Sequence, residues 1–107
     1  MRMLLKFQLD TEAANRAIDN GSMAEINEKM FAQMQPEAAY FAIEDGVRTG
    51  YVVFDLDDPS EIPVIAEPLF SGVNSKLTFT PVMNTDDLMK GLQQAGAGAA
   101  ATPHRSR

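Results

Sequence analysis

One arginine, Arg48, has the chemistry and the predicted position to hold an anion in this 107-residue chain. It falls on the side of a predicted strand that is otherwise apolar, where a guanidinium must find a carboxylate, a ligand anion or the solvent at the edge. In an enzyme, Arg48 would hold an enolate or a carboxylate. The structural alternative is that its stem runs along the apolar surface and that it pairs with Glu37, Glu67 or an acidic residue of another subunit.

Glu67 is the candidate for proton transfer. It directly precedes Pro68 and lies off the apolar stripe of its predicted helix, so that it could point into a cleft beside Asn74. Desolvation in such a cleft would raise the pKa of the carboxyl group and let it act as a general acid or base. The alternative is a solvated position on the helix flank. Glu67 and Arg48 are therefore the candidate catalytic residues, and Asn74 is a candidate ligand-binding residue.

Two tyrosines, Tyr40 and Tyr51, are the remaining candidates for ligand binding. Their rings could stack on an aromatic ligand and their hydroxyl groups could form hydrogen bonds with it. The alternative is a cross-strand aromatic pair at a subunit interface. The single histidine, His104, lies in the C-terminal tail, without the positioned surroundings that a general base requires.

The composition excludes several kinds of site. The chain has no cysteine, which excludes disulfides, thiolate metal sites and cysteine nucleophiles. The acidic runs at 44–45 and 55–58 consist of turn and cap residues and lack the spacing of a calcium loop. No pattern matches a catalytic triad, a P-loop or a dinucleotide-binding turn. We therefore expect neither a metal nor an organic cofactor.

The charge pattern bears on partners and location. The formal net charge is −6, and the lysines and arginines are scattered along the chain. Nucleic acid and anionic membranes are therefore poor partners, because both require clustered basic residues. The N-terminal segment reaches Lys6 too early for a signal peptide or a membrane helix. We expect a cytoplasmic protein.

Strands and helices that position these candidates can be predicted from the hydrophobic period. Period-2 alternation and a hairpin predict four strands, within residues 2–9, 37–44, 47–55 and 75–83. Helical spacing predicts one helical unit before Pro36, broken or kinked near Gly21, and a helix from 58 to 73. Pro68 predicts a kink or break after Glu67, because it removes a hydrogen bond. A short helix through Leu92 follows, and the Ala- and Gly-rich remainder predicts a disordered tail over 94–107.

The turn Asp45-Gly46 predicts the register of the hairpin, because a type I′ turn requires positive φ at both central residues. Tyr40 then faces Tyr51, and Phe41 faces Gly50 and can lie across it. One sheet face is apolar and meets the helices. It comprises Leu5, Phe7, Leu9, Phe41, Ile43, Val52, Phe54, Leu77 and Phe79.

The opposite face of the predicted sheet combines apolar, aromatic and polar residues, and we call it the mixed face. Its members are Leu4, Lys6, Gln8, Ala38, Tyr40, Ala42, Thr49, Tyr51, Val53, Thr78 and Thr80. The face is too apolar for free solvent and too polar for a closed core. We expect a homodimer that forms through the part of it that carries Tyr40, Thr49, Tyr51 and Thr78.

The predicted βαββαβ order and four segments resemble a family of small, uncharacterised bacterial proteins in the dimeric α+β barrel superfamily. The segments are PEAAYF at 36–41, RTGY at 48–51, IPVIAEPLF at 62–70 and PVM at 81–83. The resemblance implies an α+β, ferredoxin-like domain over residues 1–93, with a four-stranded antiparallel sheet, helices on one face and a short extra C-terminal helix. It also implies a dimeric α+β barrel with a cleft between sheet and helices.

Three functions remain open at this point, because fold similarity alone does not determine function. The first is a homodimer that binds a small, partly apolar metabolite. The second is a cofactor-independent enzyme like the isomerases, polyketide cyclases and monooxygenases of the resembled superfamily. The third is a non-catalytic interaction module. A cleft in which Glu67, Arg48 and Asn74 converge would favour the enzyme.

Overall fold

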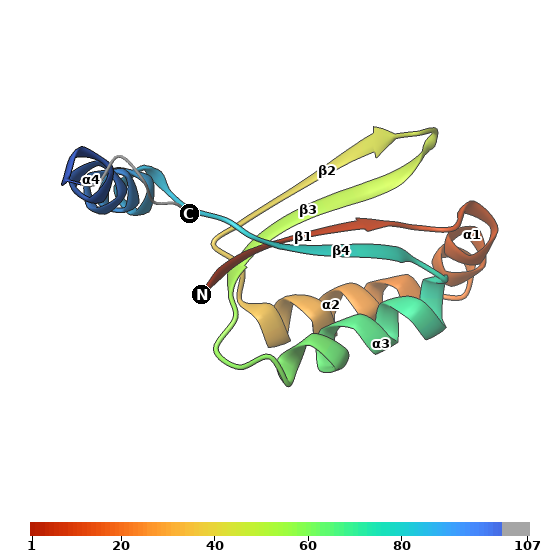
Figure 1. The fold of residues 1–107 in the computed structure, drawn as a ribbon. Coiled ribbons are helices and arrows are strands. Elements are labelled where there is room, and N and C mark those ends of the chain that lie inside the picture. Colours follow the sequence, from red (N-terminus) through yellow and green to blue (C-terminus); the bar gives the residue numbers. More distant parts are fainter. Residues whose placement is uncertain (102–107) are drawn as a thin grey trace.

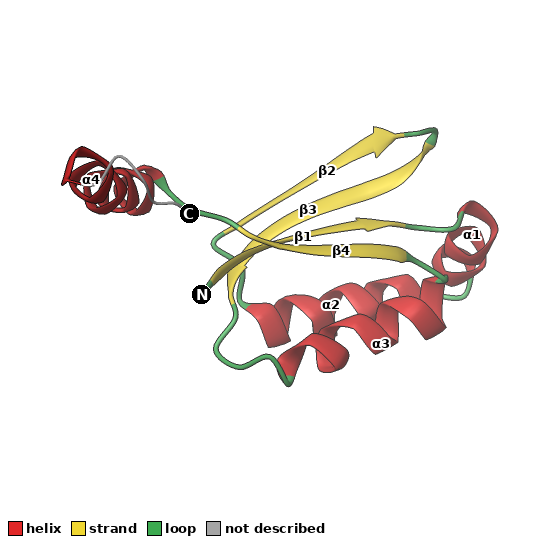
Figure 2. Ribbon diagram, viewed as in Figure 1, coloured by secondary structure: helices red, strands yellow, loops and turns green. Residues whose placement is uncertain are grey.

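The computed structural model contains four strands and four helices in the order β1-α1-α2-β2-β3-α3-β4-α4, and it describes residues 1–101 and the side chains of residues 1–96. The strands are β1 (Arg2–Gln8), β2 (Ala38–Glu44), β3 (Val47–Asp55) and β4 (Lys76–Pro81). The helices are α1 (Thr11–Asp19), α2 (Ser22–Met34), α3 (Glu61–Val73) and α4 (Thr85–Ala101). The strands form one antiparallel sheet in the order β2-β3-β1-β4, and α1, α2 and α3 lie on one side of it (Figures 1 and 2). This α+β architecture is compatible with a ferredoxin-like fold.

The core lies between the central strands and the helices. Leu5 on β1 faces Val52 on β3, and both are fully buried. Phe54 and Leu69 complete the centre of this layer with at most 1% of their surface exposed. Side chains of this size each stabilise the fold by roughly 1.5–3 kcal/mol when they are fully buried. The apolar face of β1 and β3 is therefore the face that positions the helices, as the alternation predicts.

The helical unit before Pro36 is divided into two helices. Asp10 caps α1 by accepting a hydrogen bond from the backbone N–H of Ala13 at 2.9 Å. Gly21 then adopts a φ of 84°, which an L-residue with a side chain rarely does, and α2 begins at the next residue. The interruption predicted near Gly21 is thus a full break in direction.

Of the kink or break predicted after Glu67, the break is wrong, because α3 continues through Pro68 to Val73. Proline removes the hydrogen bond that its N–H would have donated to the carbonyl of Val64. Both residues lie on the exposed side of α3, where water can solvate this carbonyl. The helix ends at Val73, and the left-handed conformation of Asn74 after it allows the N–H of Ser75 to donate to the carbonyl of Leu69 at 3.1 Å.

The hairpin has the predicted register. Asp45 and Gly46 both have positive φ, and Tyr40 pairs with Tyr51. The ring that lies over Gly50, however, is that of Phe7 on the adjacent strand and not that of Phe41.

Two residues assigned to the core are exposed. Phe41 and Ile43 point to the helix side of the sheet, but 61% and 82% of their surfaces are accessible. The reason is that β2 is the edge strand, and its hairpin end extends away from the helices (Figure 1). Alternation predicts the side of the sheet to which a residue points, but it does not predict where the covering helices end.

Helix α4 is longer than the predicted helix through Leu92 and reaches Ala101. The predicted tail therefore overlaps α4 over 94–101, and its remainder, 102–107, lies outside the described residues. The helix projects from the end of β4, away from the layer of α1, α2 and α3 (Figure 1). Within the described residues, it makes no extensive contact with any other element.

Candidate functional site

A hollow of about 250 Å³ lies under the projecting hairpin, between the sheet and the first two helices, and we call it the hairpin cleft. Strands β1, β2 and β3 form one side of it, and α1 and α2 form the other. Its lining is mostly apolar and comprises Phe7, Leu9, Ile18, Met23, Asn27, Phe41, Ala42, Arg48 and Thr49. This is the kind of place in which the sequence analysis expected a cleft, between sheet and helices.

Aromatic rings form the wall of the hairpin cleft. Phe41 packs edge-to-face against Phe7, with ring centroids 6.5 Å apart, and against Phe31, with centroids 6.3 Å apart. Phe7 is buried, whereas most of the surface of Phe41 is accessible. Packing against Phe7 and Phe31 therefore holds the Phe41 ring in place, and the accessible part of this ring remains free to contact a ligand.

Arg48 contributes the positive charge of the hairpin cleft. It lies opposite Ile43 in the hairpin, and its backbone carbonyl accepts a hydrogen bond from Leu9 at 3.0 Å, which fixes the strand at this point. Its guanidinium donates to the side-chain oxygen of Asn15 on α1 at 3.0 Å. Among the side chains of residues 1–96, no carboxylate forms an ion pair with Arg48.

The carboxylates suggested as partners of Arg48 lie elsewhere. Glu37 accepts a hydrogen bond from Arg2 at 2.7 Å, and this contact raises the pKa of the Arg2 guanidinium. Glu67 is exposed on α3. Arg48 thus has a neutral amide as its partner, which leaves its charge available to an anion.

Glu67 and Asn74 do not join Arg48 in one site. Glu67 has the solvated position given as its structural alternative, and its backbone carbonyl accepts a hydrogen bond from Ser71 at 2.9 Å. Asn74 lines two other hollows, one of about 340 Å³ between α1 and α3 and one of about 380 Å³ near the hairpin turn. Neither of these hollows nor the hairpin cleft contains two of the three residues in its lining.

The two tyrosines lie on the mixed face, on the opposite side of the sheet from Arg48. The hydroxyl of Tyr51 donates to Glu44, which also accepts a hydrogen bond from Lys6 at 2.5 Å. The Lys6 ammonium lies 5.9 Å from the centre of the Tyr51 ring. Tyr40 has no part in this cluster and is 70% exposed. The contact between Glu44 and Lys6 was not predicted from the sequence. It depends on the register between β1 and β3, and no local turn in the chain sets that register.

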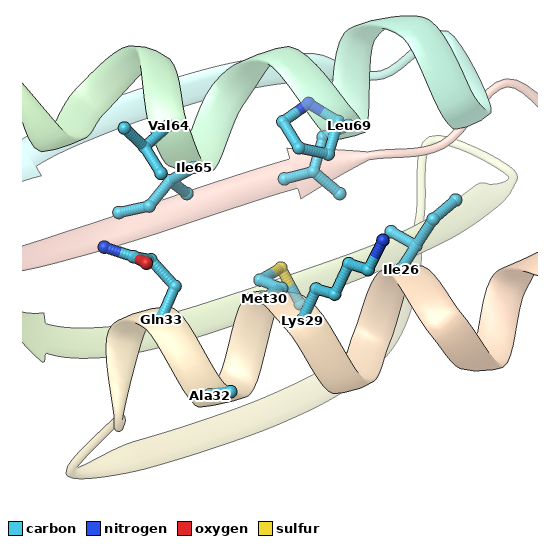
Figure 3. A pocket seen from close by; sticks show the side chains of 9 residues that line it. Ile26, Lys29, Met30, Ala32, Gln33, Val64, Ile65 and Leu69 are labelled. Carbon is cyan, nitrogen blue, oxygen red and sulfur yellow. The ribbon is translucent and has the colours of Figure 1, made fainter.

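A second apolar hollow, of about 440 Å³, lies between α2 and α3, and we call it the helix groove. Figure 3 shows its lining, in which Lys29 and Gln33 reach from α2 toward α3. These are its only polar side chains, and α3 contributes only apolar residues, Val64, Ile65, Pro68 and Leu69. The feature of the sequence that could have indicated this groove is the pair Val64 and Pro68, two apolar residues on the outer side of α3. The groove provides apolar contact but no polar groups that converge from two elements.

Other charged groups are structural. The backbone N–H of Ser60 donates to Asp58 at 2.9 Å, which lowers the pKa of this carboxyl and precedes the start of α3. Over the part of the chain that the structure describes, no three acidic or histidine side chains converge in a way that could hold a metal ion. In the same residues, no helix has both the length and the apolar character needed to cross a membrane.

Comparison of the chain with protein-family models, with curated proteins and with solved structures found no match. The hairpin cleft must therefore be interpreted from its own geometry.

Proposed function

We propose that this protein binds a small carboxylic acid with an apolar or aromatic body in the hairpin cleft, and that it does so as a homodimer. The observation that carries the proposal is Arg48, an exposed residue that lines an apolar, aromatic-walled cleft and whose guanidinium has only a neutral amide as its side-chain partner among the described residues. Arg48 would bind the carboxylate, and Phe7 and Phe41 would contact the body of the ligand.

The size and polarity of the cleft define the class of ligand. Sites for drug-sized molecules usually measure about 300–1,000 Å³. The hairpin cleft, with about 250 Å³, suits a smaller molecule. A guanidinium can bind a carboxylate through two parallel hydrogen bonds, which favours an acid over a neutral molecule of the same shape. Asn27 of α2 also lines the cleft, and its side-chain amide could donate a hydrogen bond to a second polar atom of the ligand.

Binding without catalysis is the better supported form of this proposal. An isomerase, cyclase or monooxygenase would need a group that accepts or donates a proton next to the bound carboxylate. Glu67 is exposed on α3, and Tyr40 and Tyr51 lie on the other side of the sheet. The lining of the hairpin cleft includes no acidic residue, histidine or tyrosine.

The dimer is supported by the mixed face. An apolar row of Ala38, Val53 and Leu4 crosses three strands of this face, and the row of Tyr40 and Tyr51 lies beside it. Leu4 and Val53 are only partly buried, and Tyr40 is largely exposed. Thr49, which the sequence assigned to this interface, is only 3% exposed, and its hydroxyl donates to the carbonyl of Val47 within the chain, so that it is not part of the proposed contact. A second copy that faces this sheet with its own mixed face would bury both rows and complete a dimeric α+β barrel.

Isothermal titration calorimetry with benzoate and benzyl alcohol tests the ligand proposal. We expect saturable binding of benzoate, and a dissociation constant that rises about tenfold or more in Arg48→Met, because the charge-assisted hydrogen bonds are lost. Arg48→Lys should retain part of the affinity. Benzyl alcohol, which has no negative charge, should bind weakly and equally to the wild type and Arg48→Met.

Arg16→Met is the matched control, because Arg16 is an exposed arginine of α1 that lines a different hollow. It should bind benzoate like the wild type. If benzoate fails to bind the wild type, or if Arg48→Met binds it unchanged, the proposed ligand class is wrong.

A further inference from the structure

Helix α4 leaves the body of the protein in a fixed direction. Asn84 and Asp87 cap its first turn reciprocally: the N–H of Asp87 donates to Asn84 at 2.8 Å, and the N–H of Asn84 donates to Asp87 at 3.2 Å. Arg2 holds this turn to the sheet, because its guanidinium contacts both Asp87, at 3.3 Å, and Glu37, at 2.7 Å. The start of α4 is therefore positioned, although the rest of the helix projects away from the sheet (Figure 1).

The projecting part of α4 carries an uncovered apolar stripe. Leu88, Met89 and Leu92 are 42%, 59% and 55% exposed, and their spacing places them on one side of the helix. Gly91 and Gly96 each lower the helix propensity by about 1 kcal/mol relative to alanine. An isolated helix of this length is marginal in water, so that packing of its apolar side must supply most of its stability. Within the described residues, its own chain does not supply that packing.

The mixed face of the same molecule is likewise not covered by any helix that the structure describes. Strands of about seven residues and four strands at about 4.8 Å spacing have a flat area of about 440 Å². A stable dimer usually buries about 800 Å² on each partner. Contact with α4 from each chain, about 26 Å long, would enlarge an interface formed by two mixed faces.

Charge argues against a membrane as the cover of α4. Helices that lie on membranes are typically rich in lysine and arginine. The first turns of α4 contain Asp86 and Asp87 against a single Lys90, and the whole chain has a net charge of −6.

We propose that α4 is an exchanged arm: the stripe of Leu88, Met89 and Leu92 packs on a second copy of this chain, beside its mixed face, and completes the dimer interface. This inference rests on the proposed dimer and adds the segment that holds it together. Each chain contributes one arm and receives one, so that the assembly closes as a two-fold dimer.

The test is analytical ultracentrifugation of the full chain and of two variants of α4. The double variant Leu88→Asp/Leu92→Asp places charges in the apolar stripe and should raise the dissociation constant of the dimer about tenfold or more. Gln94→Asp adds a charge on the opposite side of the same helix and should leave the dissociation constant unchanged. Circular dichroism checks that both variants keep a folded body.

Hydrogen exchange provides a second readout that does not depend on changing α4. Amide protons of residues 85–96 should be protected in the wild-type dimer. They should lose this protection in Tyr40→Asp, a variant designed to separate the subunits through the mixed face.

The outcomes separate this inference from the proposed dimer. A dimer that is weakened by the double variant but not by Gln94→Asp supports the exchanged arm. A wild-type dimer that the double variant leaves intact overturns the arm and leaves the dimer standing. A wild-type monomer overturns both, and protection of 85–96 in that monomer would show that α4 folds onto its own chain.

Discussion

Arg2 and Arg48 show how the surroundings of a residue decide its use. Arg2 contacts two carboxylates, from Glu37 and Asp87, and therefore joins the start of β2 to the arm. Arg48 contacts only the amide oxygen of Asn15 among the described side chains. Exposed ion pairs such as those of Arg2 contribute little to stability, because solvent screens the two charges. The contacts of Arg2 orient the first turn of α4, whereas Arg48 is the residue proposed to bind a ligand.

Gly50 is a residue whose lack of a side chain can be tested directly. A Cβ atom at this position would overlap the ring of Phe7, which is buried and packs edge-to-face against Phe41. We expect Gly50→Ala to lower the free energy of unfolding by about 1–3 kcal/mol, because the Phe7 ring would have to leave its packed position. Urea denaturation followed by circular dichroism measures this change.

Gly91→Ala is the control for that variant, because a Cβ atom at Gly91 would meet nothing within 4 Å. It should not destabilise the protein and should favour the helical form of α4 by up to about 1 kcal/mol. Equal stability of Gly50→Ala and the wild type would contradict the close approach of Phe7.

At the scale of elements, α3 and the hairpin illustrate two different outcomes. The turn at Asp45-Gly46 has strong local preferences, and the register that it predicts is observed. Pro68 also has a strong local preference, yet α3 continues through it. The difference is that Ile65, Leu69 and Val73 are buried along the same side of α3. Their packing holds the helix together on both sides of the missing hydrogen bond.

Pro68→Ala tests this account of α3. The substitution restores the N–H that can donate to the carbonyl of Val64, so that the free energy of unfolding should rise by about 1–3 kcal/mol. Thermal denaturation followed by circular dichroism measures the gain. Pro63→Ala, in the first turn, should have little effect, because the N–H of that position has no acceptor within the helix. A loss of stability in Pro68→Ala would instead mean that the proline ring is needed in the wall of the helix groove.

The two proposed sites lie on opposite sides of one sheet. The hairpin cleft lies between the sheet and the helices, and the proposed dimer interface lies on the mixed face. Strands β1 and β3 contribute side chains to both. Ligand binding and self-association are nevertheless tested by different residues, Arg48 for the first and Tyr40 for the second.

Tyr40→Asp tests the dimer. Tyr40 is 70% exposed, so the substitution should leave the chain folded, and a charge at the interface should produce monomers. Light scattering of the wild type should report twice the chain mass of 11.7 kDa. Ile43→Asp is the matched control, because Ile43 lies on the same strand, is 82% exposed and points to the opposite face. A wild-type monomer at micromolar concentration would end the dimer proposal.

Predictions about the candidate residues succeeded where they depend on local sequence and failed where they depend on contacts between distant segments. The pairing of Tyr40 with Tyr51 and the location of Arg48 on the helix side were predicted, because both depend on one turn and on alternation. The partner of Arg48, the exposure of Phe41 and the separation of Glu67, Asn74 and Arg48 were not. Each of these depends on where helices end relative to the sheet, and no local preference encodes that position.

The sequence by itself determined the order of strands and helices, the register of the hairpin and the composition of the two sheet faces. These follow from the hydrophobic period and from turn chemistry, which act over a few residues. Only the tertiary structure decided that α3 continues through Pro68, that Phe7 covers Gly50 and that α4 leaves the body. The physical reason is that these features depend on packing between segments far apart in the chain, where burial outweighs local propensity.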